Sequence, residues 1–315
     1  MMTDNVKNRQ KPKEVSDSFD IIEKIYGILP ERPLHLDVKT VWEDSGFAAG
    51  KAIMKGQNLI LDLGESEITL PFISVVPKGA NNLPAIISLN YDSAVPNKYL
   101  PAEEIIDRGY AIYSLDIGSI SRMDGDFKSG ISAKISRSRR KKTAAGKTSV
   151  WAWAAMRLAE QVYDLEATDK SALIIAGHGL LARSAMLAAG YNESVSFVIA
   201  NGLSAYPAPF SKNNPKSGLT VCDFTYLYSP AFAEDPSIDE IDALMEHCKD
   251  KTVLLGSSEE SEPLFCGLCP IKSNIPTAAV GIQKENISYH VRPGSEYLSR
   301  EDWNIYLDFI DKKRK

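Results

Sequence analysis

The sequence is poor in the residues that define several large classes of protein. Four cysteines in 315 residues are too few for a disulfide scaffold and are typical of a reducing compartment. The first 14 residues are polar and charged, without the apolar run of a secretory signal or a membrane span. Positive charge is not in excess, because 36 Lys and Arg stand against 41 Asp and Glu. We therefore expect a cytoplasmic protein that binds neither nucleic acid nor membranes.

Two short patterns are exceptions to this overall composition. The basic run RSRRKK at 137–142 lies between turn-forming residues and is interpreted as a solvated loop, with a polyanion site as the alternative. The CGLC segment at 266–269 has the spacing of a redox pair or half of a zinc site. No second pair completes a metal shell, so we interpret these as ordinary loop cysteines. The sequence predicts neither a metal nor a cofactor.

The chain divides into an extension and one large domain. Residues 1–40 are rich in charge and proline, and their amphipathic stretch at 19–29 predicts a short docking helix. Residues 41–315 are expected to form a single α/β domain, because 44% apolar residues can fill a large core. The first strands of this domain, at 58–63 and 68–76, end at a turn signal and predict antiparallel pairing.

Beyond residue 80, short apolar strands alternate with helices. We predict strands at 83–89, 110–115, 172–176, 195–200, 252–255 and 287–291, and helices at 101–108, 151–165, 180–189, 237–247 and 300–312. Continuous apolar strands separated by helices indicate a doubly wound, mostly parallel sheet with helices on both faces. Ligands of such sheets bind at the carboxyl ends of the strands. Polar residues follow several of these ends, among them Asn90, His178, Asn201 and Glu296.

The segment SALIIAGHGLLARSAMLAA at 171–189 predicts a strand, a tight turn and a helix. An α/β-hydrolase presents its nucleophilic serine on such a turn, within a G-x-S-x-G element. Here Gly179 occupies the serine position and offers no oxygen nucleophile. Glycine adopts the strained backbone of this turn at little cost, so the substitution is compatible with folding. The sequence therefore predicts the scaffold of a hydrolase without its central atom.

Three ordered motifs resemble the acetyl xylan esterase and glucuronoyl esterase group of α/β-hydrolases. WAWAAMR at 151–157 resembles the W-A-W-G-x-x-R helix of that group, and GHGLLAR at 177–183 resembles its G-H-S-R-x-G-K elbow. YHVRPGSE at 289–296, followed by Asp302-Trp303, resembles its R-P-G-x-H segment and D-W helix. The resemblance extends from about residue 45 to residue 312. It implies an α/β-hydrolase fold and a small acylated or carbohydrate-like ligand.

The departures from this group all fall on the reaction centre. The resemblance places its nucleophilic Ser at Gly179, its oxyanion-stabilising Arg at Leu180 and its general-base His at Glu296. The acid falls among residues 259–263, with Glu260 as the approximate position. Asn90 and His178 are assigned to the substrate or oxyanion region.

These losses bear directly on catalysis. A triad needs a hydroxyl to attack and a base to take its proton, and a carboxylate near its reference pKa of about 4.3 is a weak base. We do not expect other side chains to replace the lost catalytic residues. His178 and Ser184 are interpreted as packing groups, and His290 as a core histidine. His247 and Cys248 are neighbours in the sequence, but we do not interpret them as a catalytic pair.

Two functional hypotheses remain. The first is a catalytically inactive α/β-hydrolase with a ligand-binding or protein-binding role and an unidentified protein partner. The alternative is an active hydrolase in which Glu296 and the acidic residues at 259–262 activate a water molecule.

Overall fold

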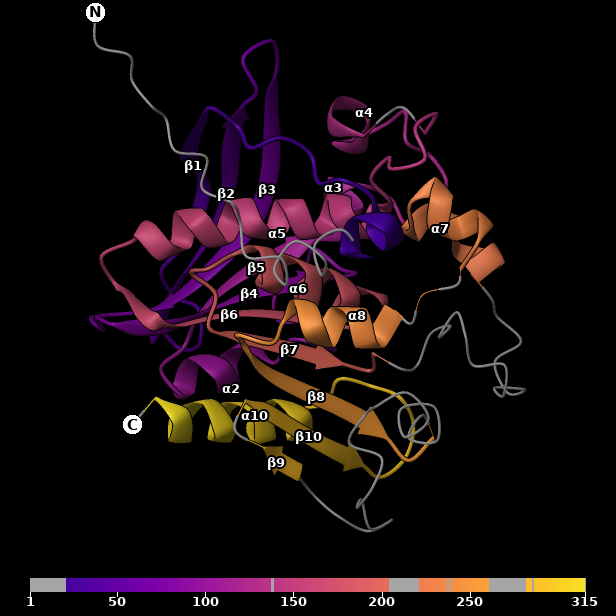
Figure 1. Ribbon diagram of the computed structural model, residues 1–315. Helices are drawn as coiled ribbons and strands as arrows, with labels where there is room; N and C mark the ends of the chain where they lie inside the picture. The colour runs from indigo at the N-terminus through magenta and orange to yellow at the C-terminus, as the bar shows by residue number, and fades with distance from the viewer. Residues whose placement is uncertain are drawn as a thin grey trace, which may run out of the picture.

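The fold is organised around one mixed sheet. The computed structural model describes residues 21–136, 139–203, 221–236, 238, 240–260, 282–284 and 286–314. Within this part of the chain, ten strands form one sheet in the order β1-β2-β3-β5-β4-β6-β7-β8-β10-β9 (Figure 1). The strands are β1 (His35–Asp44), β2 (Ala52–Asp62), β3 (Glu67–Pro77), β4 (Leu83–Asn90), β5 (Ala111–Asp116), β6 (Thr168–His178), β7 (Phe197–Asn201), β8 (Thr252–Ser258), β9 (Ile282–Lys284) and β10 (Ile287–Arg292).

The pairing of the strands follows the pattern that the sequence predicts. β2 is antiparallel to both of its neighbours, β1 and β3, and β3 joins the rest of the sheet by antiparallel pairing with β5. The strands from β5 through β4, β6, β7 and β8 to β10 are parallel. The predicted α/β-hydrolase sheet, mostly parallel with antiparallel N-terminal strands, is confirmed.

Helices cover both faces of the sheet, as predicted (Figure 1). One face carries α5 (Lys147–Asp164), α6 (Leu180–Tyr191) and α8 (Glu240–His247), and the other carries α2 (Ala102–Asp107) and α10 (Arg300–Lys313). Shorter helices lie in the connections: α3 (Ile117–Ile120), α4 (Ser132–Ile135), the 3-10 helix η1 (Val221–Leu227) and α7 (Pro230–Glu234). None of the helices in the described ranges has the length and hydrophobicity needed to span a bilayer.

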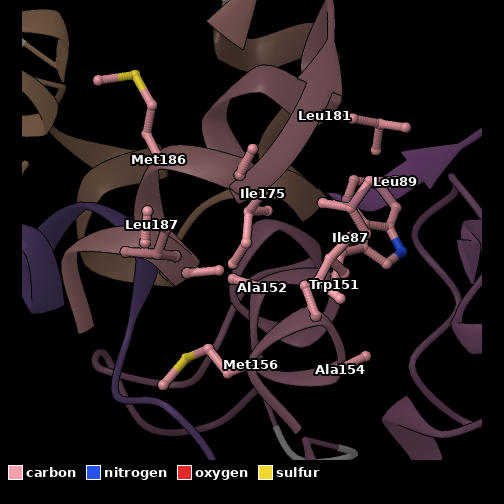
Figure 2. Close-up of a cluster of buried hydrophobic side chains, with 14 of the residues drawn as sticks. Ile87, Leu89, Trp151, Ala152, Ala154, Met156, Ile175, Leu181, Met186 and Leu187 are labelled. Atoms are coloured by element: carbon pink, nitrogen blue, oxygen red, sulfur yellow. The ribbon is translucent and has the colours of Figure 1, made fainter. Parts of the chain in front are cut away.

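The core consists of two layers because strand side chains alternate between the faces. On β4, Ile87 and Leu89 belong to the layer under α5 and α6, whereas Ile86 belongs to the layer under α2 and α10. Figure 2 shows Ile87 and Leu89 beside Trp151 of α5 and Leu181 of α6. Each such side chain contributes about 1.5–3 kcal/mol when it leaves water. The two layers position the strand ends that carry the site described below.

The N-terminal segment is part of this packing. Residues 21–26 are helical, and Ile22, Ile25 and Tyr26 are fully buried, as expected for the amphipathic stretch. The backbone carbonyl of Tyr26 accepts hydrogen bonds from Gly146 N at 2.8 Å and from Ser149 Oγ at 2.9 Å. These bonds attach the segment to the start of α5.

Three local expectations differ from the structure or lie outside it. The edge strand β1 has no counterpart among the predicted strands, and it crosses position 40, the expected end of the N-terminal extension. Most of its side chains are exposed, so its sequence lacks an apolar pattern. In the basic run, Arg140, Lys141 and Lys142 are exposed as expected, but Arg139 is partly buried and donates to the carbonyls of Ala145 at 2.8 Å and Tyr228 at 2.7 Å. This guanidinium satisfies loop carbonyls that folding removes from water. Residues 137–138 and the CGLC segment at 266–269 lie outside the described residues.

The burial of His247 predicts a loss of stability in mild acid. His247 lies against Gly190 and the ring of Tyr191, and burial lowers the pKa of its imidazole to about 4. Between pH 6.5 and 4 the unfolded state therefore binds a proton that the folded state does not. The free energy of unfolding should fall over this window by at most roughly 3 kcal/mol from this group. Urea unfolding at pH 7 and pH 4.5 measures the effect.

The matched variants separate His247 from the rest of the titration. His247→Gln should have a smaller loss of stability between the two pH values, whereas His35→Gln, on the exposed edge strand, should keep the wild-type loss. An unchanged loss in His247→Gln would contradict the assignment.

Candidate functional site

The turn between β6 and α6 has the geometry of a nucleophile elbow. β6 ends at His178 and α6 begins at Leu180, so Gly179 alone reverses the chain, with φ of 60° and ψ of −122°. Its amide donates to the carbonyl oxygen of Asn201 at 2.9 Å. A Cβ on Gly177 would overlap the backbone of Leu181, so glycine is also needed where the helix passes the strand. The backbone of the elbow is present, and its central residue carries no side-chain oxygen.

The imidazole of His178 is held in one orientation. Its Nδ1 lies 2.8 Å from Asn201 Oδ1, and the amide nitrogen of Asn201 donates to the hydroxyl of Tyr306 at 2.9 Å. Because Asn201 presents its oxygen to the ring, Nδ1 carries the proton and Nε2 is the basic nitrogen. Burial lowers the pKa of His178 below its ordinary value, although the bond to Asn201 opposes this shift. With this lowered pKa, the imidazole of His178 is neutral near pH 7. The centroid of the Tyr99 ring lies 5.1 Å from the centroid of the imidazole.

Glu296 lies beside His178, although the two residues are far apart in the sequence. Its Oε1 is 4.0 Å from Nδ1 of His178, and its Oε2 accepts a hydrogen bond from Ser258 Oγ at 3.2 Å. A Cβ on Gly202 would overlap Oε1 of Glu296, so the glycine leaves room for the carboxylate. The structure thus brings two of the predicted site residues, His178 and Glu296, together next to Gly179.

A buried ionic cluster fixes the loop that carries Glu296. Arg292 donates through Nε to Asp302 Oδ2 at 3.2 Å and through Nη2 to the carbonyl of Ser295 at 2.7 Å. Asp302 also accepts from His290 Nε2 at 2.7 Å. Burial alone would raise the pKa of Asp302, but hydrogen bonds from His290 and the neighbouring Ser299 outweigh it and lower the pKa. His290 is therefore a core histidine, as expected from the sequence, and it is paired with Asp302 through Nε2, whereas its buried Nδ1 has no hydrogen-bond partner among the described residues.

The other predicted site residues lie as follows. Asn90, at the end of β4, donates through its side chain to Ser114 Oγ at 2.8 Å and so ties β4 to β5. Leu180 is 4% exposed and belongs to the core layer under α5 and α6. Glu260 is exposed in the turn after β8, while the backbone amide of its neighbour Glu259 donates to the carbonyl of Arg292 at 2.9 Å. Residues 261–263, the rest of the predicted acid segment, lie outside the described residues.

The substitute nucleophiles point away from this site. Ser184 is buried and donates to the carbonyl of Thr148 on α5 at 3.2 Å. His247 Nε2 lies 3.2 Å from the carbonyl oxygen of Leu187, and Cys248 Sγ lies 3.1 Å from that of Met186. Both side chains contact carbonyls of α6, so they are packing groups of the interface between α6 and α8.

The chemistry available at the centre follows from these groups. A carboxylate and a neutral imidazole both accept hydrogen bonds, and neither replaces the hydroxyl that attacks an ester carbonyl. The amide of Gly179 is occupied by Asn201. Within the described ranges, no group of three His, Cys, Asp or Glu side chains is arranged to hold a metal ion. The described groups are suited to binding hydroxyl or ammonium donors.

Sequence reasoning missed the residues that orient the centre. Asn201 was named only as one of several polar residues that follow a predicted strand, and Gly202 and Ser258 were assigned no role. Tyr99 gave no signal, because it lies in an irregular segment and reaches His178 through the tertiary fold. A polar residue at a strand end followed by glycine is the one pattern that could have pointed to Asn201.

Comparisons with known proteins identify the fold. No family model and no curated protein matches the sequence. A glucuronoyl esterase from Solibacter usitatus superposes with a TM-score of 0.79 at 18% identity, over 95% of this chain and 92% of that one. A promiscuous CE15 esterase from the marine bacterial metagenome gives 0.77 at 18% identity, over 95% and 91% of the two chains. A glucuronoyl esterase from Teredinibacter turnerae gives 0.77 at 16% identity, over 96% and 84%.

The order of the strands and the backbone of the elbow are those of an α/β-hydrolase fold. The solved structures similar to this chain include CE15 glucuronoyl esterases, which agrees with the motif resemblance at 151–157, 177–183 and 289–296. Sequence identity of at most 18% to each of these structures means that the likeness shows a shared fold.

Proposed function

We propose that this protein is a catalytically inactive α/β-hydrolase that binds a small acylated or carbohydrate-like ligand at the centre formed by His178 and Glu296. The observation that carries the proposal is Gly179 at the elbow, with φ of 60° and no side-chain nucleophile. A solved neighbour, a mutant glucuronoyl esterase from Sporotrichum thermophile, is in complex with methyl 4-O-methyl-β-D-glucopyranuronate. This complex supports the choice of a carbohydrate-like ligand for the first binding test.

The position of Glu296 supports a binding role. Its carboxylate is largely buried, with 18% of its side chain exposed, and it is aligned by the hydroxyl of Ser258. Hydrogen bonds to ionised acceptors are stronger than neutral ones, so a sugar hydroxyl would bind well here. The same carboxylate is the observation that favours the alternative function, a hydrolase that activates water.

One assay separates the two functions. The protein is treated with a fluorophosphonate probe, and turnover of p-nitrophenyl acetate is followed in the same preparation. We expect no labelled serine and a rate equal to that of buffer, because no described group supplies the nucleophile. Labelling of a serine would contradict the proposed inactivity, and turnover that Glu296→Gln abolishes would establish the hydrolase that activates water.

Binding is tested with methyl 4-O-methyl-β-D-glucopyranuronate at millimolar concentration by thermal shift. We expect a rise in Tm for the wild type and a smaller rise for Glu296→Ala, because a ligand that binds the folded state stabilises it. Glu301→Ala, on the first turn of α10, is the acidic control and should keep the full rise. Equal shifts in all three proteins would contradict binding at Glu296.

We also propose that the protein is located in the cytoplasm. The low cysteine content supports this location. Cys248 is a free, buried thiol, and burial raises its pKa to about 12, which keeps it protonated and inert.

A further inference from the structure

A groove of about 350 Å³ lies over the antiparallel half of the sheet, where neither Gly179 nor Glu296 contributes to its walls. Its sides come from β1, β2 and β3, and its far end reaches the carboxyl end of β5 and the segments that follow β4 and β5. We propose that this groove binds a neutral oligosaccharide, with the indole of Trp42 as the surface on which a pyranose ring stacks. The proposal is independent of the function proposed for the central site.

The exposure of Trp42 distinguishes it from the other tryptophans. Its side chain is 44% exposed, whereas the three other tryptophans, Trp151, Trp153 and Trp303, are at most 1% exposed. Indole is one of the largest apolar groups, and leaving it in water forgoes a substantial stabilisation. An exposed tryptophan at the rim of a groove therefore favours a ligand-binding role.

The backbone is shaped to hold this indole in place. The register of β1 and β2 shifts between Thr40 and Trp42, and Trp42 then pairs with Gly56. A Cβ on Gly56 would overlap the indole ring, so the ring rests directly against the backbone of β2. Bulges redirect side chains, and glycine inside a strand marks a close approach. The two features together fix the orientation of the aromatic surface.

The polar lining of the groove matches the hydroxyl groups of a sugar. Gln57 and Asn58 contribute amides, Ser93 and Ser119 contribute hydroxyls, and Asp116 contributes a carboxylate. Amide and hydroxyl groups both donate and accept hydrogen bonds, as sugar hydroxyls do. Gln57 is held by bonds to Ser74 Oγ at 2.6 Å and Thr40 Oγ1 at 3.3 Å. A pyranose has an apolar C–H face and a polar edge, which correspond to the indole and to these groups.

The charge of the groove selects among oligosaccharides. Among the described residues that line it, Asp116 is the one with an ionised side chain. Its Oδ1 accepts a hydrogen bond from Gly118 N at 2.8 Å, which keeps the carboxylate at the end of β5. A uronate in the groove would meet this like charge, whereas a neutral sugar would donate hydroxyl protons to it. We therefore expect neutral chains to bind more tightly than chains of uronic acids.

The test measures binding of cellohexaose, xylohexaose, mannohexaose and hexagalacturonate by isothermal titration calorimetry and by tryptophan fluorescence. Quenching of the fluorescence by acrylamide reports Trp42, because the other three tryptophans are buried and shielded from the quencher. We expect at least one neutral hexasaccharide to bind and to protect the fluorescence from acrylamide. Hexagalacturonate should bind more weakly.

Two variants test the stacking surface, and one serves as a control. Trp42→Ala should reduce the affinity about tenfold, as expected for loss of an aromatic contact. Gly56→Ala retains the indole but displaces it, and it should weaken binding to a similar degree. Leu34→Ala changes an apolar side chain that is 67% exposed outside the groove, and it should bind like the wild type.

Two outcomes would overturn the proposal. The first is that none of the three neutral hexasaccharides binds to the folded wild type. The second is that Trp42→Ala leaves their binding unchanged. If the wild type is instead a dimer by light scattering and Trp42→Ala makes it monomeric without any response to sugars, the surface is an interface between copies.

Discussion

Ester hydrolysis is expected to return to this fold when Gly179→Ser, Glu296→His and Ser258→Asp are introduced together. The first change supplies the nucleophile on an elbow whose backbone is already in place, with φ of 60° and ψ of −122°. The second replaces the carboxylate of Glu296, which lies next to His178, with an imidazole base. The third supplies an acid, since Ser258 Oγ lies 3.2 Å from Oε2 of Glu296. An acid at this distance can hold the new imidazole in the reactive tautomer.

The expected gain is at least about 100-fold in p-nitrophenyl acetate hydrolysis over the unchanged protein, because general-base catalysis contributes about 10²–10⁴. Gly179→Ser alone should stay within a few-fold of background, since its hydroxyl has no imidazole placed to deprotonate it. The serine costs roughly 1–3 kcal/mol of backbone strain at positive φ. Leu180→Arg is left out, because Leu180 is 4% exposed and a cation there would be buried in the core.

A matched control carries Gly179→Ala with the same changes at positions 258 and 296. It has the same elbow strain and no hydroxyl, so it should remain inactive and unlabelled by a fluorophosphonate. Equal activity in Gly179→Ser and in the triple variant would contradict the argument, because a working base would then already be present. Unfolding curves for each variant establish that the compared proteins are folded.

Loss of Glu240 is expected to cause the largest change in stability. Its carboxylate is fully buried and accepts from Arg183 Nε at 2.9 Å and from Tyr228 Oη at 3.2 Å. It also accepts a hydrogen bond from the hydroxyl of Tyr26. Glu240→Ala leaves the charge of Arg183 buried without this carboxylate, and such a change costs about 3–5 kcal/mol. Urea unfolding should show a lower midpoint with little change in slope.

Two further variants make the assignment specific. Arg183→Met combined with Glu240→Leu removes both charges and should recover most of the loss, because apolar replacements of buried ion pairs are often neutral. Glu246→Ala, on the same helix, breaks an exposed pair with Lys249 and should change the free energy of unfolding by less than about 1 kcal/mol. A loss in Glu240→Ala no larger than that in Glu246→Ala would contradict the central role of the pair.

Much of the architecture was predictable because it depends on local patterns. The apolar strands at 172–176 and 195–200 lie within or overlap β6 and β7, and the elbow glycine lies where the strand-turn-helix pattern places it. The edge strand β1 was not predictable in this way, because its side chains are mostly exposed. Helix α5 begins at Lys147, one turn before the expected start, and there Lys147 is buried and donates to Ser121 Oγ at 2.5 Å. A lysine whose ammonium is satisfied inside the fold gives no apolar signal.

The sequence by itself determined the class of fold and the absence of a serine at position 179, since both depend on residues that are close together in the chain. Tertiary structure decided what surrounds that glycine: Asn201 orients His178, and Glu296 reaches the same imidazole from a loop held by Arg292. It also decided that Trp42 lies against Gly56. The physical reason is that such contacts depend on sheet order, strand register and loop closure, which bring together residues that no local periodicity relates.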